Sequence, residues 1–109
     1  MGSNKVIISN AAKKEIDEAL RYISFELSNP KAANDLYLKI LDVYDMISRF
    51  PESYPLVSYF LATYTNTRKA PVNNYTVIYR YFRSTKTIII LRFLSSKRNF
   101  DDLYATIEW

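Results

Sequence analysis

Residues 68–98, RKAPVNNYTVIYRYFRSTKTIIILRFLSSKR, decide the fold that the sequence predicts. Two runs within them, residues 75–82 and 87–94, are dense in β-branched and aromatic residues, and a short polar link separates the runs. This pattern is typical of a β-hairpin. Because both faces of the hairpin would be largely apolar, each face needs cover. We expect the rest of the chain to cover one face and a partner to cover the other.

Because side chains alternate between the faces of a strand, a turn with an even number of residues fixes which residues share a face. One predicted face carries Thr76, Ile78, Arg80, Phe82, Ile89, Leu91 and Phe93. The other carries Val77, Tyr79, Tyr81, Ile88, Ile90 and Arg92. Arg80 and Arg92 thus stand inside strands. An arginine there either pairs with a helix acid, such as Glu15 or Asp42, or contacts a ligand.

A short strand and a helix are predicted at the start of the chain. Residues 5–9 (KVIIS) form an apolar run typical of a strand, and Ser9 or Asn10 is suited to cap the helix that follows. From there to Leu27, apolar residues recur at steps of three and four, which gives the helix one apolar stripe.

A second helix is predicted from Asn29 and Pro30, a capping side chain followed by a proline at the first helical position. Its apolar residues keep a helical period as far as Ile47, and the Phe-Pro pair at residues 50–51 ends it. Because only a short linker joins the two helices, we expect them to pack as an antiparallel hairpin.

Three strands are expected after the helices. Residues 51–67 fit a loop or one irregular turn, whereas residues 66–72 indicate a short strand that Pro71 restricts to a sheet edge. Residues 100–109 fit a short last helix or an arm. We predict an α+β fold in a single domain, residues 1–109, with residues 1–3 a cloning remnant. In it, an N-terminal strand and the antiparallel helical hairpin precede a three-strand antiparallel meander packed on the helices, and the other sheet face stays open.

The composition excludes several classes of function. The chain of 109 residues can bury one core, and it holds no cysteine and no histidine. This excludes disulfides, thiol nucleophiles, Cys/His zinc sites and imidazole acid–base catalysis. No apolar run has the length of a membrane span and the start lacks the pattern of a signal peptide. We therefore expect a cytoplasmic protein with no membrane partner, no metal and no other cofactor.

Charge is divided unevenly along the chain. Residues 53–100 hold eight Lys or Arg and no Asp or Glu, whereas the part up to Glu52 is nearly balanced. The net charge of the whole chain is only +4. A positive field concentrated in this way favours an anionic partner, either a nucleic acid or an acidic protein. The alternative is a solvated basic surface.

Several short motifs, taken in their order and spacing, resemble the RelE/ParE superfamily of toxins from bacterial type II toxin–antitoxin modules. They are the junction Asn29-Pro30-x-Ala32-Ala33, the stops Phe50-Pro51 and Tyr54-Pro55, the strand Tyr75-x-Val77-Ile78-Tyr79-Arg80, the apolar residues 88–91 and the pair Lys97-Arg98. The resemblance covers nearly the whole chain. It implies a growth-inhibiting toxin, neutralised by a cognate antitoxin whose extended segment wraps the toxin and occupies its basic concave surface.

The resemblance leaves three alternatives open for the mechanism. RelE-like members are ribosome-dependent endoribonucleases that cut messenger RNA and need no metal. ParE-like members inhibit DNA gyrase without catalysis. A degenerate member would act only through its antitoxin complex. Besides the antitoxin, the implied partners are thus the ribosome with messenger RNA, or gyrase.

Compared position by position, the ribonuclease branch implies Lys69, Arg98 and Tyr104 as the catalytic candidates. Cleavage through the ribose 2′-hydroxyl needs a base, an acid and positive charge at the phosphate. Thr76 stands where that branch has an arginine, and this departure fits the gyrase branch better. We expect Arg98 to lie near Arg68 and Lys69 at the end of the sheet. The candidates for binding RNA or the partner are Arg68, Lys69, Arg80, Arg92 and Lys97.

Overall fold

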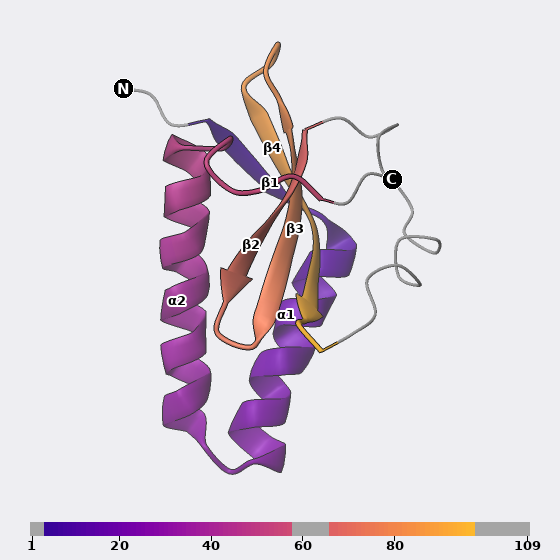
Figure 1. The fold of residues 1–109 in the computed structure, drawn as a ribbon. Helices are drawn as coiled ribbons and strands as arrows, with labels where there is room; N and C mark the ends of the chain where they lie inside the picture. The colour runs from indigo at the N-terminus through magenta and orange to yellow at the C-terminus, as the bar shows by residue number, and fades with distance from the viewer. Residues whose placement is uncertain (1–3, 58–65, 98–109) are drawn as a thin grey trace.

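The computed structural model describes residues 4–57 and 66–97, and Figure 1 shows how their elements are arranged. The strands are β1 (Lys5–Ile8), β2 (Thr67–Val72), β3 (Tyr75–Phe82) and β4 (Thr87–Ser95), and they form one sheet in the order β1-β4-β3-β2. The helices α1 (Asn10–Arg21) and α2 (Pro30–Arg49) precede β2. This confirms the predicted α+β fold with its N-terminal strand, helical hairpin and antiparallel meander. The alternative last helix, residues 100–109, lies outside the described residues.

The starts of both helices are fixed by the residues that the sequence indicated. The Ser9 hydroxyl accepts a hydrogen bond from the Ala12 N–H at 3.0 Å and donates one to the Leu91 carbonyl at 2.8 Å. It therefore caps α1 and also ties the helix to β4. The Asn29 side chain accepts a backbone N–H three residues further on at 3.1 Å, and Pro30 is the first residue of α2.

The α1 helix ends before the apolar stripe that the sequence predicts. The stripe extends to Leu27, but the α-helix stops at Arg21 and a five-residue π-helical turn, η1 (Tyr22–Glu26), follows it. Figure 1 shows the joined end of the helices reaching past the β2–β3 turn. Phe25 and Leu27 are accordingly 75% and 55% exposed. The last turn of the predicted stripe thus leaves a large apolar surface in solvent.

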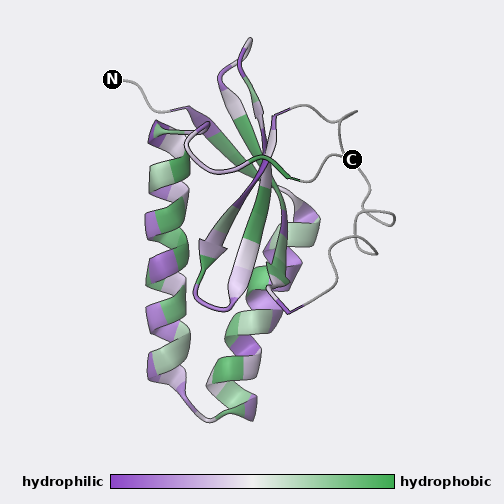
Figure 2. Cartoon of the chain, viewed as in Figure 1, coloured by the Kyte–Doolittle hydropathy of each residue, from purple (hydrophilic) through white to green (hydrophobic). Residues whose placement is uncertain are grey.

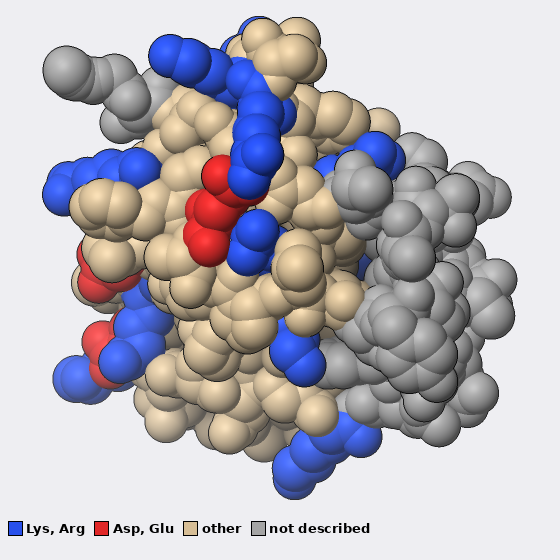
Figure 3. All heavy atoms as spheres, turned by 45° about the horizontal axis from the view of Figure 1, so that its top comes forward, with Lys and Arg blue, Asp and Glu red and all other residues tan. Residues whose placement is uncertain are grey.

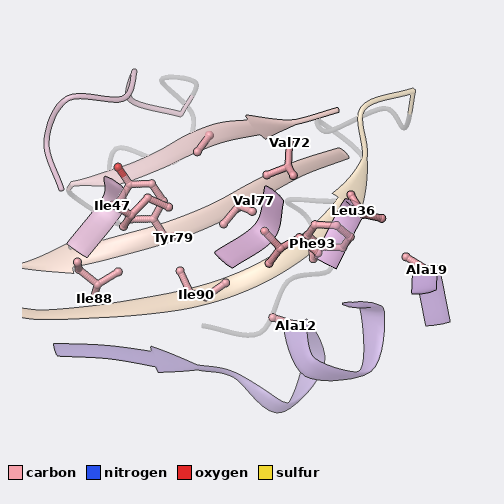
Figure 4. Close-up of a cluster of buried hydrophobic side chains, with 12 residues drawn as sticks. Ala12, Ala19, Leu36, Ile47, Val72, Val77, Tyr79, Ile88, Ile90 and Phe93 are labelled. Atoms are coloured by element: carbon pink, nitrogen blue, oxygen red, sulfur yellow. The ribbon is translucent and has the colours of Figure 1, made fainter. Parts of the chain in front are cut away.

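The core lies between the sheet and the helices. Val77 and Tyr79 of β3 and Ile88, Ile90 and Phe93 of β4 are at most 2% exposed. They pack in one cluster with apolar side chains of both helices (Figure 4). Figure 2 shows hydrophobic segments along the central strands. Truncating such a buried side chain to alanine typically costs about 2–5 kcal/mol of unfolding free energy, so this layer stabilises the fold.

One irregularity in the β3–β4 pairing overturns part of the predicted face assignment. Tyr79 pairs with Ile90 but Ile78 pairs with Arg92, so Leu91 is an extra residue in β4. The bulge reverses the alternation beyond it. Phe93 therefore packs in the core rather than on the Ile78 face, and Arg92 stands opposite Ile78. The predicted faces were wrong after Ile90, because they assumed an unbroken register.

Helix α1 completes the edge of β4 where β1 ends. β1 runs parallel to β4 only as far as the pair Ile8 and Ile90. Beyond that point the Glu15 carboxylate accepts the Phe93 N–H at 2.9 Å and the Arg92 guanidinium, whose Nη2 lies 2.6 Å away. A helix side chain thus replaces the missing strand and satisfies a backbone donor that the short β1 cannot reach.

The sheet face away from the core cluster is not as open as the sequence predicted. Ile78 is fully buried, and Leu94 and Thr76, which stand opposite each other on that face, are 2% and 7% exposed. Because shielding an isoleucine or a leucine from water is favourable, an open face of this composition would be unfavourable. The prediction of an open face was therefore wrong at these positions, although Lys69, opposite Ile78, is exposed.

Left-handed turn positions are filled without glycine. Ser28, Asn66, Asn73 and Lys86 have φ between 50° and 57°, and the only glycine of the chain is Gly2. Asparagine tolerates this conformation better than most residues because its side chain can bond locally.

Within the described ranges, neither helix is long and apolar enough to cross a membrane.

Candidate functional site

Basic residues from the second half of the chain surround a surface hollow of about 450 Å³. The hollow lies between the loop after α2, the start of β2 and the tip of the β3–β4 hairpin. Its lining residues are Glu52, Leu56, Asn66, Arg68, Arg80, Tyr81, Phe82, Arg83 and Ser84. Figure 3, in which the hairpin end comes forward, shows basic side chains on both sides of an acidic one on this face. We call this feature the arginine hollow.

The loop after α2 is held firmly beneath the hollow. The Tyr79 hydroxyl donates to the Pro51 carbonyl at 2.7 Å, and burial raises the pKa of this phenol. Further along, the Val57 N–H donates to the Thr67 carbonyl at 2.8 Å and the Lys69 N–H donates to the Pro55 carbonyl at 3.1 Å. These bonds attach the loop to the outer edge of β2, so Glu52 projects from a fixed backbone.

Glu52 is the electrostatic centre of the arginine hollow. One of its oxygens, Oε2, accepts hydrogen bonds from Arg83 Nε at 2.8 Å and from Asn66 Nδ2 at 2.9 Å. Arg83 Nη2 lies 2.7 Å from the same oxygen and Arg68 Nη2 lies 3.7 Å from it. The hydrogen bonds from Arg83 and Asn66 hold the pKa of the Glu52 carboxyl below its usual value.

Arg68 is the most firmly positioned cation of the hollow, with a side chain only 14% exposed. Its Nη1 donates to the carbonyls of Tyr54 at 2.6 Å and Glu52 at 3.1 Å, and its Nε donates to Asn66 Oδ1 at 2.8 Å. Asn66 itself has a φ of 57°, a conformation that asparagine adopts readily. Two backbone carbonyls and one amide therefore fix the guanidinium at the wall of the hollow.

Arg80 and Arg83 add charge from the hairpin. The Arg80 guanidinium lies over the Phe82 ring, 4.7 Å from its centre, which is a cation–π contact. Arg83 is 74% exposed and forms an ion pair with Glu52. The hollow therefore combines two largely shielded cations, Arg68 and Arg80, with the exposed cation Arg83.

The structure separates the basic residues that the sequence singled out. Arg68 and Arg80 come together at the arginine hollow. Lys97 lies at the opposite end of the sheet, because the neighbouring Ser96 N–H donates to the carbonyl of Asn74 in the β2–β3 turn. The four residue steps from Arg68 to Val72 put roughly 13 Å of strand between the two ends.

The remaining candidates have other positions. Arg92 forms the ion pair with Glu15, which is the structural alternative that the sequence allowed. Lys69 is exposed and is not among the lining residues of the hollow. Arg98 and Tyr104 lie outside the described residues. The expected meeting of Arg98 with Arg68 and Lys69 therefore stays a prediction.

Sequence reasoning missed three residues of the hollow: Glu52, Asn66 and Arg83. Glu52 is the last acid before the stretch without acids, and this position was a usable signal. An acid at the border of a basic segment is its nearest available counter-ion. The roles of Asn66 and Arg83 depend on two turns meeting in space, which no local pattern encodes.

Comparison with known proteins assigns the chain to a family. Residues 6–100 match a family model described as the ParE toxin of the type II toxin–antitoxin system parDE. Because the match covers most of the chain, the protein belongs to the ParE toxin family of type II toxin–antitoxin systems. The superfamily predicted from the sequence is thereby confirmed. No curated protein sequence matches the chain.

Solved structures of toxin–antitoxin systems share the fold. The chain is similar to one from the chromosomal ParDE system of P. aeruginosa, with 14% identity, coverage of 85% of this chain and 96% of that chain, and a TM-score of 0.67. The toxin–antitoxin complex RelBE2 from Mycobacterium tuberculosis gives 18% identity, 87% and 93% coverage and a TM-score of 0.59. The archaeal RelE–RelB complex from Pyrococcus horikoshii gives 22% identity, coverage of 89% of this chain and 99% of that chain, and a TM-score of 0.57.

Proposed function

We propose that this toxin is bound and silenced by a cognate antitoxin, and that it inhibits DNA gyrase by docking, without cleaving a substrate. The observation that carries the second part is the separation of the cations in the described chain. RNA cleavage needs a base, an acid and positive charge around a single phosphate. The described candidates surround no such point.

Two positions in particular do not support cleavage. Thr76, at the place of an arginine in the ribonuclease branch, is 7% exposed and its hydroxyl lies 2.9 Å from the Ser96 hydroxyl. Arg92 is held by both oxygens of Glu15. A small buried hydroxyl and a paired guanidinium offer little charge to a transition state. A docking surface, by contrast, needs only shape and charge.

The exposed apolar side chains of the helices support a protein partner. Phe25 and Tyr37 border a second hollow, of about 340 Å³, between the joined ends of α1 and α2. They are 75% and 45% exposed. Leu38 and Leu41, which belong to α2, are 50% and 43% exposed. Apolar surface of this extent is typical of a site for another protein, and an antitoxin segment would cover it.

The test applies two assays to the purified protein without antitoxin. We expect supercoiling of relaxed plasmid by gyrase to stop, while messenger RNA on translating ribosomes stays intact. Arg98→Ala and Tyr104→Phe, which remove the two C-terminal catalytic candidates, should leave gyrase inhibition largely unchanged. Codon-spaced cuts in the message that vanish in Arg98→Ala would overturn the proposal and establish the ribonuclease alternative.

A further inference from the structure

The outer face of α2 carries two exposed leucines, although the solvent face of a helix is normally polar. Leu38 and Leu41 are 50% and 43% exposed. Leu38 is two residues from both Leu36 and Ile40, which are 2% exposed, so at about 100° a residue it points nearly opposite to the core. Figure 1 shows α2 along one side of the molecule. Its outer face is therefore available to a second helix.

A charged residue stands on each side of the leucines. Lys31, Leu38 and Asp45 are seven residues apart, so they lie on nearly one line along the helix, which we call the α2 row. Lys31 is in the first turn of α2, which holds no acid, and Asp45 borders the last turn. Both charges have the sign opposite to the one that the helix dipole favours at that end. The stability of α2 alone therefore does not explain them.

An antiparallel second copy of the helix matches this order of charges. A two-fold axis close to Leu38 would bring Lys31 of each copy to Asp45 of the other and set the exposed leucines against one another. It would also place each positive helix N-terminus beside a negative C-terminus. A parallel arrangement would instead place Lys31 beside Lys31 and Asp45 beside Asp45. The row is thus complementary to itself in the antiparallel direction only.

The ion pairs within α2 leave both charges able to contact a second copy. Lys31 Nζ lies 2.9 Å from Asp35 Oδ2, and Arg49 Nη2 lies 2.8 Å from Asp45 Oδ2. All four side chains are at least 52% exposed, so little stability depends on these pairs. An ammonium has three donors and a carboxylate has about four acceptor sites. Lys31 and Asp45 can therefore keep their own partners and gain another.

We propose that this toxin, when free of antitoxin, forms a two-fold antiparallel dimer through the α2 row. The 20 residues of α2 span about 30 Å. Contact along one helix of this length gives an interface at the low end of specific ones, which is typical of a weak and reversible dimer. Because an antitoxin segment is proposed to cover Leu38 and Leu41, antitoxin binding would separate the two copies. The dimer is independent of gyrase inhibition, and its test contains neither gyrase nor antitoxin.

The test measures the mass of the full-length protein by sedimentation equilibrium from about 10 µM to about 1 mM. We expect the mass to rise from 12.8 kDa toward twice that value. Leu38→Asp should lower the association constant more than about tenfold, because it buries a charge near the two-fold axis. A mass that stays at 12.8 kDa would overturn the proposal and leave the leucines to the antitoxin. Unchanged association of Leu38→Asp would also overturn it, because another surface would then join the copies.

Charge exchange at the ends of the row tests the antiparallel order. Lys31→Asp and Asp45→Lys should each weaken association roughly three- to tenfold, because each puts like charges together at both ends. The two variants mixed should associate about as strongly as the wild type, because every end contact then joins opposite charges. A mixture that associates no more tightly than either variant alone would overturn the proposed order.

Matched controls come from two exposed residues of α1, Lys14 and Glu18. Lys14→Asp and Glu18→Lys change the net charge by the same amounts as the row variants. They should leave association unchanged, both alone and mixed. Effects equal to those of the row variants would overturn the proposal, because net charge alone would then explain association. Thermal unfolding of each variant verifies that it is folded.

Discussion

Two arginine–carboxylate pairs in this molecule have almost the same closest distance and different surroundings. Arg92 Nη2 lies 2.6 Å from Glu15 and Arg83 Nη2 lies 2.7 Å from Glu52. The first pair is 20% and 16% exposed, and its carboxylate also accepts the Phe93 N–H at the edge of β4. The second is 74% and 32% exposed and borders a hollow. The surroundings of a pair, rather than its distance, separate one that stabilises the fold from one that contributes little.

The largest effect that follows from this comparison concerns Glu15. Replacing Glu15 by Ala would leave the Arg92 charge and the Phe93 N–H without their acceptor in a largely buried place. We expect a loss of about 2–3 kcal/mol in the free energy of unfolding, measured by urea denaturation. The control is Glu18→Ala, an exposed acid on the same helix. Equal losses in the two variants would contradict the structural role of the first pair.

The next effect tests what holds the loop that carries Glu52. Tyr79→Phe removes a hydroxyl that donates to the Pro51 carbonyl at 2.7 Å. Because a buried carbonyl then loses its partner, we expect about 1–2 kcal/mol of destabilisation in the same urea experiment. Tyr37→Phe is the control, since Tyr37 is 45% exposed. An unchanged Tyr79→Phe protein would mean that the loop is held by other contacts.

The smallest effect concerns Glu52 and its dependence on pH. Hydrogen bonds from Arg83 and Asn66 lower the pKa of Glu52 below the ordinary value of 4.5. A pKa lowered by folding stabilises the protein above that value, and the contribution is lost as the pH falls through the folded-state pKa. We therefore expect Glu52→Gln to unfold at nearly the wild-type midpoint at pH 7, with any remaining difference vanishing below pH 4.5. A large difference at pH 7, resistant to 1 M salt, would instead make the second pair structural like the first.

Local patterns in the sequence were sufficient for most of the fold. The capping residues Ser9 and Asn29 make the bonds expected of them, and the alternation of β3 places Val77 and Tyr79 in the core. The bulge at Leu91 was not predictable in this way, because one extra residue in an apolar run leaves no mark in composition. Its consequence is large, since it moves Arg92 and Phe93 to the faces opposite to those predicted.

The candidate site was predictable only in part. The basic stretch indicated Arg68 and Arg80, both of which line the arginine hollow. The partners that position or balance them, Glu52 and Asn66, come from the loop after α2 and the turn before β2. Their meeting depends on the loop attaching to the edge of β2, a tertiary contact that spacing along the chain does not encode.

The most direct test of docking as the mechanism is a titration of gyrase supercoiling with toxin at two gyrase concentrations. Both gyrase concentrations lie well above the toxin concentration that half-inhibits a trace amount of gyrase. An inhibitor that acts by docking is consumed one to one, so we expect the half-inhibiting concentration of toxin to rise in proportion to gyrase. The same toxin preparation should leave messenger RNA intact on translating ribosomes. Docking would be contradicted if gyrase stayed active at an excess of toxin while toxin far below the ribosome concentration cut the messenger RNA. A catalytic toxin would then be required.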